Sequence, residues 1–280
     1  MIADLHLHTS FSDGTYSPEE LAGHAVAAGL HAVSLTDHDT VEGCPRMAAA
    51  CDRAGLEFIP GAELTAELQG REFHILGYWL DVDSVPLRTR LAEFQAARTQ
   101  RIHDMVERLN RRGIPLTAEQ VLGLAHCASP GRPHVARALV AGGHCRSYDD
   151  AFDRFLKKGR PAWVSKATME VEPTVRLIHE AGGVAVLAHP GLYRADEMIP
   201  ALAAAGLDGI ECWHTRHSQM AADSYARVAE RLGLAVTGGS DCHGMAKGEP
   251  LIGRVRLPYE RVVALKARRP VLAATAAVTP

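Results

Sequence analysis

Histidine and carboxylate side chains recur along this chain at spacings that suit metal binding. The first group, Asp4, His6 and His8, alternates with apolar residues. Alternation is typical of a β-strand, in which residues two apart point to the same side, so both imidazoles can reach one cation. One His-x-His pair is weak evidence, because a histidine beside apolar residues is more often a packed or surface residue than a ligand.

More residues of these types follow other expected strands, at the point where each strand ends. They are Asp37, His38, Asp39, Glu63, His189, Asp241 and His243. Asp13 lies in the loop after the first strand and His74 on an additional strand at residues 72–79, so both can reach the same place. Burying so many imidazoles and carboxylates without cations would be very costly. The pattern therefore predicts a metal centre.

The donor types limit the choice of metal. Nitrogen and oxygen ligands without cysteine suit Zn, Mn or Fe better than Ca or Mg. Glu63 has two carboxylate oxygens, which can bridge two cations and hold them close enough to share a hydroxide. We expect two to three divalent transition metals.

The elements that must position these residues alternate between strands and helices. Ser17, Pro18 and Glu20 form a capping box that starts a helix ending at Gly29. Strands are expected at residues 32–35 and 56–59, and the alternation resumes at residues 173–237. Such alternation predicts a parallel sheet, and strand ends that carry polar residues favour a βα barrel, whose catalytic face lies there.

A segment without convincing strands interrupts the alternation. Residues 87–112 form a long charged helical pattern, and shorter helices are expected near Glu119, Val135 and Asp150. We therefore predict an α/β protein with a barrel domain at residues 1–99 and 169–280 and a helical insertion at residues 100–168.

Charge and cysteine usage restrict the partners and the compartment. The formal net charge is −3, so no global basic field attracts long duplex nucleic acid. The six cysteines form no regular framework, which indicates reduced thiols and a cytoplasmic protein. The start of the chain lacks a secretion signal pattern, and we expect no membrane span. The oligomeric state stays open.

The motifs together resemble the PHP (polymerase and histidinol phosphatase) family over nearly the whole chain. They are Asp4-Leu-His6-Leu-His8-Thr-Ser-Phe-Ser-Asp13-Gly14, Thr36-Asp37-His38-Asp39, Gly61-Ala-Glu63, His74, Ala188-His189-Pro190 and Gly239-Ser240-Asp241-Cys-His243. The resemblance implies a distorted (βα)7-type barrel with a trinuclear metal site. Carried over by position, it assigns His6, His8, Glu63 and Asp241 to the first metal, Glu63, His74 and His189 to the second, and Asp13, His38 and His243 to the third.

Within this family, a short chain with a helical insertion resembles the nucleoside 3',5'-bisphosphate phosphatases and the enzyme that trims short RNA from its 5' end. The expected substrate is a small phosphorylated molecule, a nucleotide or short oligonucleotide. Arg132 precedes an expected helix, a good place for a phosphate. Relatives have a similar segment, so we predict Arg132, His134 and Lys166 as phosphate-binding residues.

The expected reaction is hydrolysis of a phosphate monoester by a metal-bound hydroxide. The leaving alkoxide needs a proton, which a metal-bound water or a nearby acid such as Asp37, Asp39 or His214 could supply. Close alternatives are a cyclic phosphodiesterase, a sugar-phosphate phosphatase and a histidinol-phosphate phosphatase. More distant alternatives are an amidohydrolase, which also begins with His-x-His, and a non-catalytic metal-binding regulatory module.

Overall fold

The computed structural model describes residues 1–270, and its first elements alternate as the sequence predicts. They are β1 (Ile2–Leu7), α1 (Pro18–Ala27), β2 (Ala32–Leu35), α2 (Cys44–Ala54) and β3 (Glu57–Leu68). The predicted capping box is present: Ser17 Oγ accepts from the Glu20 backbone N–H, and Glu20 Oε2 accepts from Ser17 N–H. Gly55, at φ 68°, ends α2 in the left-handed conformation that glycine adopts readily.

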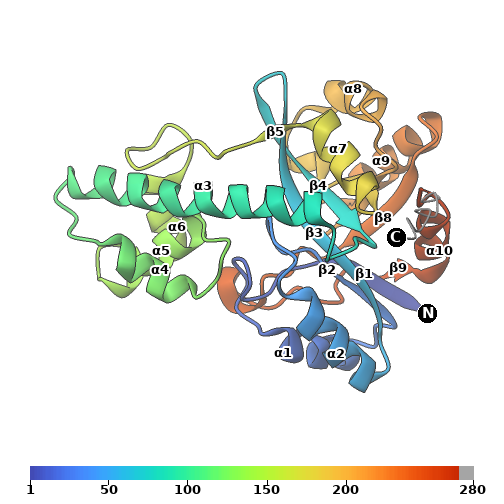
Figure 1. Cartoon of the computed structure of the whole chain (residues 1–280), viewed down its shortest axis with the longest axis horizontal. Coiled ribbons are helices and arrows are strands. Elements are labelled where there is room, and N and C mark those ends of the chain that lie inside the picture. Colours follow the sequence, from blue (N-terminus) through green and yellow to red (C-terminus); the bar gives the residue numbers. More distant parts are fainter. Residues whose placement is uncertain (271–280) are drawn as a thin grey trace, which may run out of the picture.

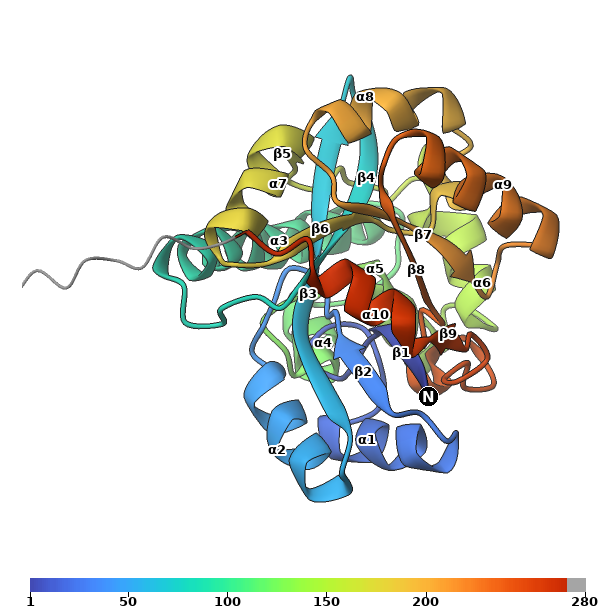
Figure 2. The same cartoon turned by 90° about the vertical axis from the view of Figure 1, so that its right-hand side faces the viewer.

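The second half of the barrel contains more irregular connections. In chain order its elements are β4 (Arg71–Tyr78), β5 (Met169–Glu170), α7 (Val171–Glu180), β6 (Val184–Leu187), the 3-10 turns η2 (Pro190–Leu192) and η3 (Asp196–Met198), α8 (Ile199–Ala204), β7 (Gly209–His214), α9 (Gln219–Arg231), β8 (Ala235–Gly239), the 3-10 turn η4 (Gly244–Lys247), β9 (Leu257–Pro258) and α10 (Tyr259–Lys266). Figure 2 shows the helices arranged around the sheet, with α10 beside β1, β8 and β9.

The strands form a nearly closed, barrel-shaped sheet, which confirms the predicted fold. The strand order is β8-β7-β6-β4-β3-β2-β1-β9, with β5 paired to β3. Opposite ends approach each other, because Leu7 forms a bridge with Cys242 just after β8. Gly239 permits this contact, since a Cβ there would collide with the Cβ of His6.

The sheet is not wholly parallel, which corrects the expectation that alternating strands and helices form a parallel sheet. β3 runs to Leu68, well past the expected end near Ile59, and turns at Gly70 into the antiparallel β4, which then pairs antiparallel with β6. The parallel pairing of β3 with β2 ends at Pro60. Glu63 therefore lies in the middle of β3, just beyond the last residue of β3 that pairs with β2.

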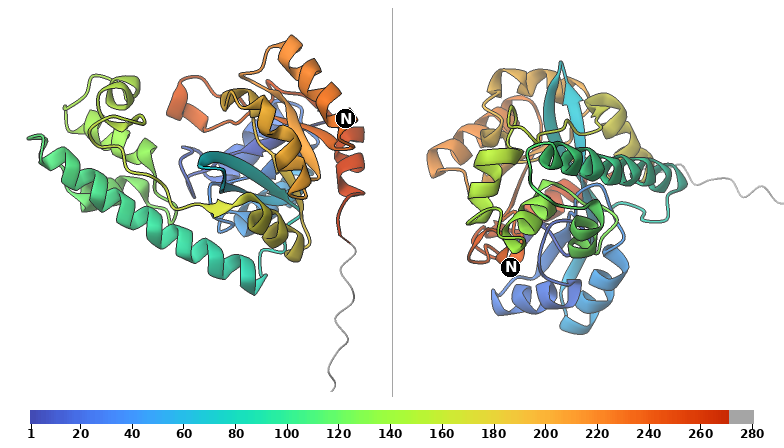
Figure 3. Two further views of the ribbon diagram at one scale, coloured as in Figure 1. Left: turned by 90° about the horizontal axis from the view of Figure 1, so that it is seen from above. Right: turned by 90° about the vertical axis from the view of Figure 1, so that its left-hand side faces the viewer.

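A separate group of helices lies to one side of the barrel (Figures 1 and 3). It consists of α3 (Val85–Asn110), α4 (Ala118–Ala125), α5 (Arg132–Ala141), α6 (Tyr148–Ala151) and the π-helical turn η1 (Phe152–Leu156). The long helix α3 joins both parts, because Leu87 and Leu91 pack into the barrel core whereas Ile102 and Met105 pack into a core of the helical group. The division at residue 100 stays a prediction.

A membrane-spanning helix must be both long and apolar. None of the helices within residues 1–270 is both long and apolar enough to cross a bilayer.

Candidate metal centre

The imidazoles and carboxylates of the strand ends converge at the mouth of the barrel. They form four overlapping sets: His6, His8 and Asp241; His6, Glu63 and His189; His38, Glu63 and His74; and His8, Asp13, His38 and His243. Within each set the donor atoms lie within 4.8 Å of one another. Every residue proposed as a ligand from the sequence belongs to at least one set. The arrangement is consistent with divalent cations, and which residue binds which ion stays a prediction.

Glu63 lies at the centre of this cluster. Its Oε1 is 2.7 Å from His74 Nδ1 and 3.0 Å from His189 Nε2. Its Oε2 is 3.0 Å from His38 Nδ1 and 3.4 Å from His6 Nε2. Burial alone would raise the pKa of Glu63, but His38 and the other surrounding imidazoles hold it well below its usual range. An ionised carboxylate whose two oxygens face different imidazoles is suited to bridge two cations.

Several buried nitrogen and oxygen atoms of the cluster, which could bind a metal, have no hydrogen-bond partner within the described part of the chain. They are His6 Nε2, both ring nitrogens of His8, Asp13 Oδ1, His38 Nδ1, Glu63 Oε2 and His189 Nδ1. A buried polar atom without a partner costs about 1–3 kcal/mol. Burial, together with the nearby His243, lowers the pKa of His8 to about 3, so its imidazole is neutral and able to bind a metal. The residues present therefore fit bound cations.

The two aspartates proposed as proton donors are occupied by other contacts. Asp37 accepts hydrogen bonds from the backbone N–H of Thr9 at 2.8 Å and from Ser12 Oγ at 2.5 Å, and burial raises its pKa to about 7. Asp39 Oδ2 accepts two bonds from Arg98, from Nε at 2.8 Å and Nη2 at 2.6 Å. Asp37 thus fixes the loop that leads to Asp13, and Asp39 anchors α3. Their part in proton transfer stays a prediction.

His214 also has a supporting position. Its Nδ1 accepts from the backbone N–H of Arg216 at 3.1 Å, so in the neutral ring the proton is on Nε2. That nitrogen lies 3.5 Å from Asp241 Oδ2, and the His214 side chain is fully buried. Asp241 Oδ1 faces His8 Nε2 at 3.2 Å. The geometry suits His214 for orienting Asp241 better than for touching a leaving group.

Glu211, which sequence reasoning missed, orients two of the proposed ligands. Its Oε1 lies 3.0 Å from His6 Nδ1, and its Oε2 accepts the backbone N–H of His189 at 2.8 Å. If His6 donates from Nδ1, its Nε2 is left to face the cluster. Glu211 lies inside β7, three residues before its end at His214, so a rule that selects only residues at strand ends does not find it.

We expect the Glu211→Gln substitution to weaken metal binding about 10- to 100-fold, the range typical of lost outer-shell partners. The amide keeps the size of the side chain and can still accept from His6. The NH2 group of the glutamine would then face the backbone N–H of His189, and because both are donors this hydrogen bond would be lost. Calorimetric titration of metal-free protein with Mn²⁺ measures the change. Glu57→Gln, which alters a β3 carboxylate bonded to Tyr259, is the matched control. Equal affinities in both variants would exclude this role.

A cavity of about 890 Å³ opens between the cluster and the helical group, within the range of ligand pockets. The barrel contributes Asp13, His38, Glu63, His74, His189, Asp241 and His243 to its wall. The opposite wall includes Arg98, Arg101, Ser129, Arg132, Tyr148, Phe152 and Lys166. The helical group therefore covers the mouth of the metal centre.

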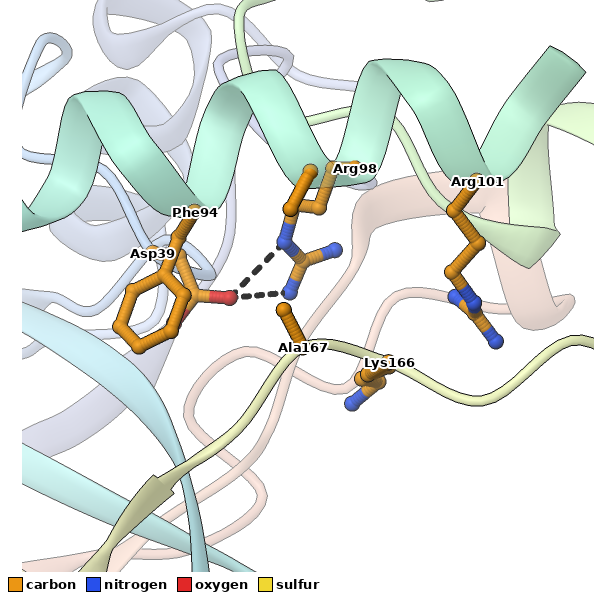
Figure 4. A pocket seen from close by; sticks show the side chains of 7 residues that line it. Asp39, Phe94, Arg98, Arg101, Lys166 and Ala167 are labelled. Carbon is orange, nitrogen blue, oxygen red and sulfur yellow. Dashed lines mark hydrogen bonds and ion pairs between the residues drawn. The ribbon is translucent and has the colours of Figure 1, made fainter.

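The cations on this wall differ in their partners. Arg98 is paired with Asp39, and Lys166 Nζ lies 2.8 Å from Glu72 Oε1 and 3.1 Å from His74 Nε2. Figure 4 shows Arg98, Arg101 and Lys166 around a second, smaller pocket, which shares these three residues with the cavity.

Arg101 and Arg132, in contrast, make no ion pair with any described residue; they donate to the carbonyls of Val164 and Leu156, at 2.9 Å and 3.3 Å. Arg101 stays charged, although burial beside Arg132 and Arg98 lowers its pKa to about 9. Arg101 gave no signal in the sequence, because an arginine in a charged helix is ordinarily solvated. These two arginines leave the wall with excess positive charge.

His134 does not reach the cavity wall, in contrast to the other two residues proposed for phosphate binding. Its side chain is buried, and its Nδ1 accepts from the backbone N–H of Gly131 at 3.0 Å. Burial lowers its pKa to about 4, so the ring is neutral. The structure gives His134 the role of capping α5, and we omit it from the phosphate site proposed below.

Comparisons with known proteins place the chain in one family. The PHP domain family matches residues 4–129. The chain is 33% identical to a 5'-3' exoribonuclease of Haemophilus influenzae, over 86% of this chain and 89% of that protein. It is 33% identical to a 3',5'-nucleoside bisphosphate phosphatase of Chromobacterium violaceum, over 89% and 90% of the two chains. It is 30% identical to a phosphoribosyl 1,2-cyclic phosphate 1,2-diphosphodiesterase of Eggerthella lenta, over 90% and 98%.

A solved structure from Bifidobacterium adolescentis, described as a metal-dependent phosphoesterase, has the same fold. It superimposes with a TM-score of 0.89 at 34% identity, covering 96% of this chain and 97% of that one. The relatives named above are all hydrolases of phosphoric ester bonds.

Proposed function

This chain belongs to the PHP family of metal-dependent phosphoesterases, and from that premise we propose that it hydrolyses a phosphate monoester of a small nucleotide that carries a second phosphate. Candidate substrates are a nucleoside 3',5'-bisphosphate and the 5' end of a short RNA. The bisphosphate corresponds to the activity of the Chromobacterium violaceum relative, and RNA is the substrate class of the Haemophilus influenzae exoribonuclease; both relatives align with most of this chain.

The observation that carries this proposal is the unpaired charge opposite the metal centre. Arg101 and Arg132 line the same cavity as Glu63 and have no carboxylate partner among the described residues. A substrate with one phosphate at the metals and a second anionic group at these arginines would neutralise both charged regions. Guanidinium groups bind phosphate through paired, charge-assisted hydrogen bonds. A substrate with a single phosphate, bound at the metals, would leave the guanidinium groups of Arg101 and Arg132 without an anionic partner.

When bound at the cluster, divalent cations lower the pKa of water toward neutrality and neutralise charge on phosphoryl oxygens. The side chains of this protein hold the donor atoms in place. Glu211 fixes His6, Asp37 fixes the loop before Asp13, and His214 faces Asp241. We propose Mn, Zn or Fe as the metals, two to three per chain, because the donors are nitrogen and oxygen.

We expect wild-type protein to hydrolyse a nucleoside 3',5'-bisphosphate with a much lower KM than the corresponding nucleoside monophosphate. In the Arg101→Ala and Arg132→Ala variants the KM for the bisphosphate should rise about 10- to 100-fold, because each change removes charge-assisted hydrogen bonds. The KM for the monophosphate should change little. Phosphate release over a panel of bisphosphates, monophosphates, cyclic phosphates and sugar phosphates measures both effects.

Arg112→Ala is the matched control for these variants, since Arg112 is an exposed arginine of the helical group that does not line the cavity. Equal KM values for bisphosphate and monophosphate in the wild type would contradict the proposal. Turnover confined to cyclic phosphates would instead favour the activity named for the Eggerthella lenta relative.

The compartment we propose is the cytoplasm. All six cysteines are free thiols in the structure, and disulfides are rare in reducing compartments.

A further inference from the structure

Two aromatic rings stand on the cavity wall beside the unpaired arginines. Tyr148 and Phe152 are one helical turn apart, with ring centroids 4.9 Å apart and a 36° angle between their planes. Both are half-buried, since each packs partly against the core of the helical group and partly lines the cavity. The cavity therefore has an apolar wall opposite its metal-binding wall.

The backbone that carries the rings has an unusual, wide turn. The helix α6 is capped by Ser147, whose Oγ accepts from the Asp150 backbone N–H at 3.2 Å. It passes directly into the π-helix at Phe152–Leu156. Short π-helical turns occur frequently at functional sites. Here the turn leaves Phe152 on the cavity wall while Leu156 is fully buried in the core.

Neighbouring groups complement an aromatic ligand that carries a phosphate. The Arg132 guanidinium lies 5.8 Å from the centroid of the Phe152 ring, so the anion-binding side chain adjoins the aromatic wall. The Tyr148 hydroxyl has no hydrogen-bond partner in the described part of the chain. Burial and the negative charge of Asp13 raise the Tyr148 pKa, which keeps the phenol neutral and able to donate. A nucleobase offers a flat face to the rings and polar edges to the hydroxyl.

We propose that Tyr148 and Phe152 form a nucleobase-binding wall that selects nucleotides over sugar phosphates. The inference rests on the proposed function and adds to it the location of the base. Stacking on aromatic side chains is sequence-tolerant, because every base has a π-face. The wall thus accommodates any base while Arg101 and Arg132 bind the second phosphate and the metal centre receives the phosphate to be cleaved.

The test compares a nucleoside 3',5'-bisphosphate with ribose 3,5-bisphosphate, which lacks the base. In Phe152→Leu and Tyr148→Leu, kcat/KM for the nucleotide should fall about 10- to 100-fold, the effect of losing a stacked base. The value for the base-free substrate should be unchanged. Tyr148→Phe keeps the ring and should retain most of the nucleotide activity. Phe155→Leu is the matched control, because Phe155 belongs to the same turn but packs beneath Arg154 and does not line the cavity.

Binding measurements keep the inference separate from the proposed reaction. Calorimetric titration of metal-loaded protein with adenosine 5'-phosphate and with ribose 5-phosphate requires no turnover. Weaker adenosine 5'-phosphate binding in Phe152→Leu, with ribose 5-phosphate binding unchanged, would support the wall even if the bisphosphate were not hydrolysed. Equal losses for both ligands, or no loss for either, would overturn it.

Discussion

We expect the Glu63→Gln protein to lose phosphate release by more than about 100-fold. Loss of an outer-shell partner of a metal ligand costs 10- to 100-fold, and removal of a carboxylate proposed to bind the metals directly should cost more. The two oxygens of Glu63 face different imidazoles of the cluster, so an amide leaves at least one group of donors without its anionic oxygen. The size of the side chain is unchanged, so packing around it is preserved. Phosphate release and bound metal per chain measure the effect.

Glu67→Gln is the matched control for this variant. Glu67 lies on the same strand four residues later, but its Oε2 accepts from Thr168 Oγ1 at 3.1 Å and it does not line the cavity. We expect its activity and metal content to match those of the wild type. Glu63→Gln protein that keeps both full activity and full metal content would remove Glu63 from the centre of the site.

The second large effect should follow removal of the metals. Chelation followed by dialysis should reduce phosphate release to background, and re-addition of Mn, Zn or Fe should restore it. Because the ions bind the folded protein, they should also raise its Tm; a ligand at 100 times its Kd stabilises a fold by about 2.7 kcal/mol. This readout is independent of catalysis and reflects the buried donor atoms that have no partner within the described residues.

Activity, Tm and metal content together decide the result of this experiment. Two to three equivalents of a transition metal per chain would agree with the number we propose. Full activity in protein shown by elemental analysis to be metal-free would contradict a metal-dependent reaction. Unchanged Tm on re-addition would show that the cluster binds no ion in the folded state.

The named activities of the relatives favour phosphoric ester hydrolysis over the more distant alternatives that the sequence leaves open, while one solved structure with this fold, 31% identical, is described as an amidohydrolase. Both an amidohydrolase and a regulatory metal-binding module are compatible with His6 and His8 alone. The curated relatives that align with most of this chain are named as phosphoric ester hydrolases, and the fold matches that of a phosphoesterase. Hydrolysis of a phosphoric ester is therefore the chemistry of this protein.

Sequence patterns predicted the barrel but missed the antiparallel direction of two strands, β4 and β9. Alternating strands and helices indicated the parallel pairs of β1 with β2 and of β7 with β8 correctly. The same patterns placed the end of β3 near Ile59, because they contain no sign that a strand continues beyond its parallel partner. Pairing with the antiparallel β4 extends β3 to Leu68. That pairing depends on two faces meeting in space, which periodicity does not encode.

The sequence by itself determined which side chains gather at the barrel mouth. Strands that share a direction bring their carboxyl ends to one edge, so residue type and strand position sufficed to propose His6, His189 and Asp241 as neighbours. No knowledge of individual contacts was needed for this step.

Only the tertiary structure decided what the other polar residues do. The partner of His6 is Glu211, 205 residues away, and the partner of Asp39 is Arg98, 59 residues away on α3, the helix that joins the two cores. Such partners assign Asp39 to anchoring α3 and leave Arg101 and Arg132 unpaired on the cavity wall. The physical reason is that hydrogen bonds and burial depend on the approach of distant segments, whereas a sequence pattern reports only the direction in which each side chain leaves its own strand or helix.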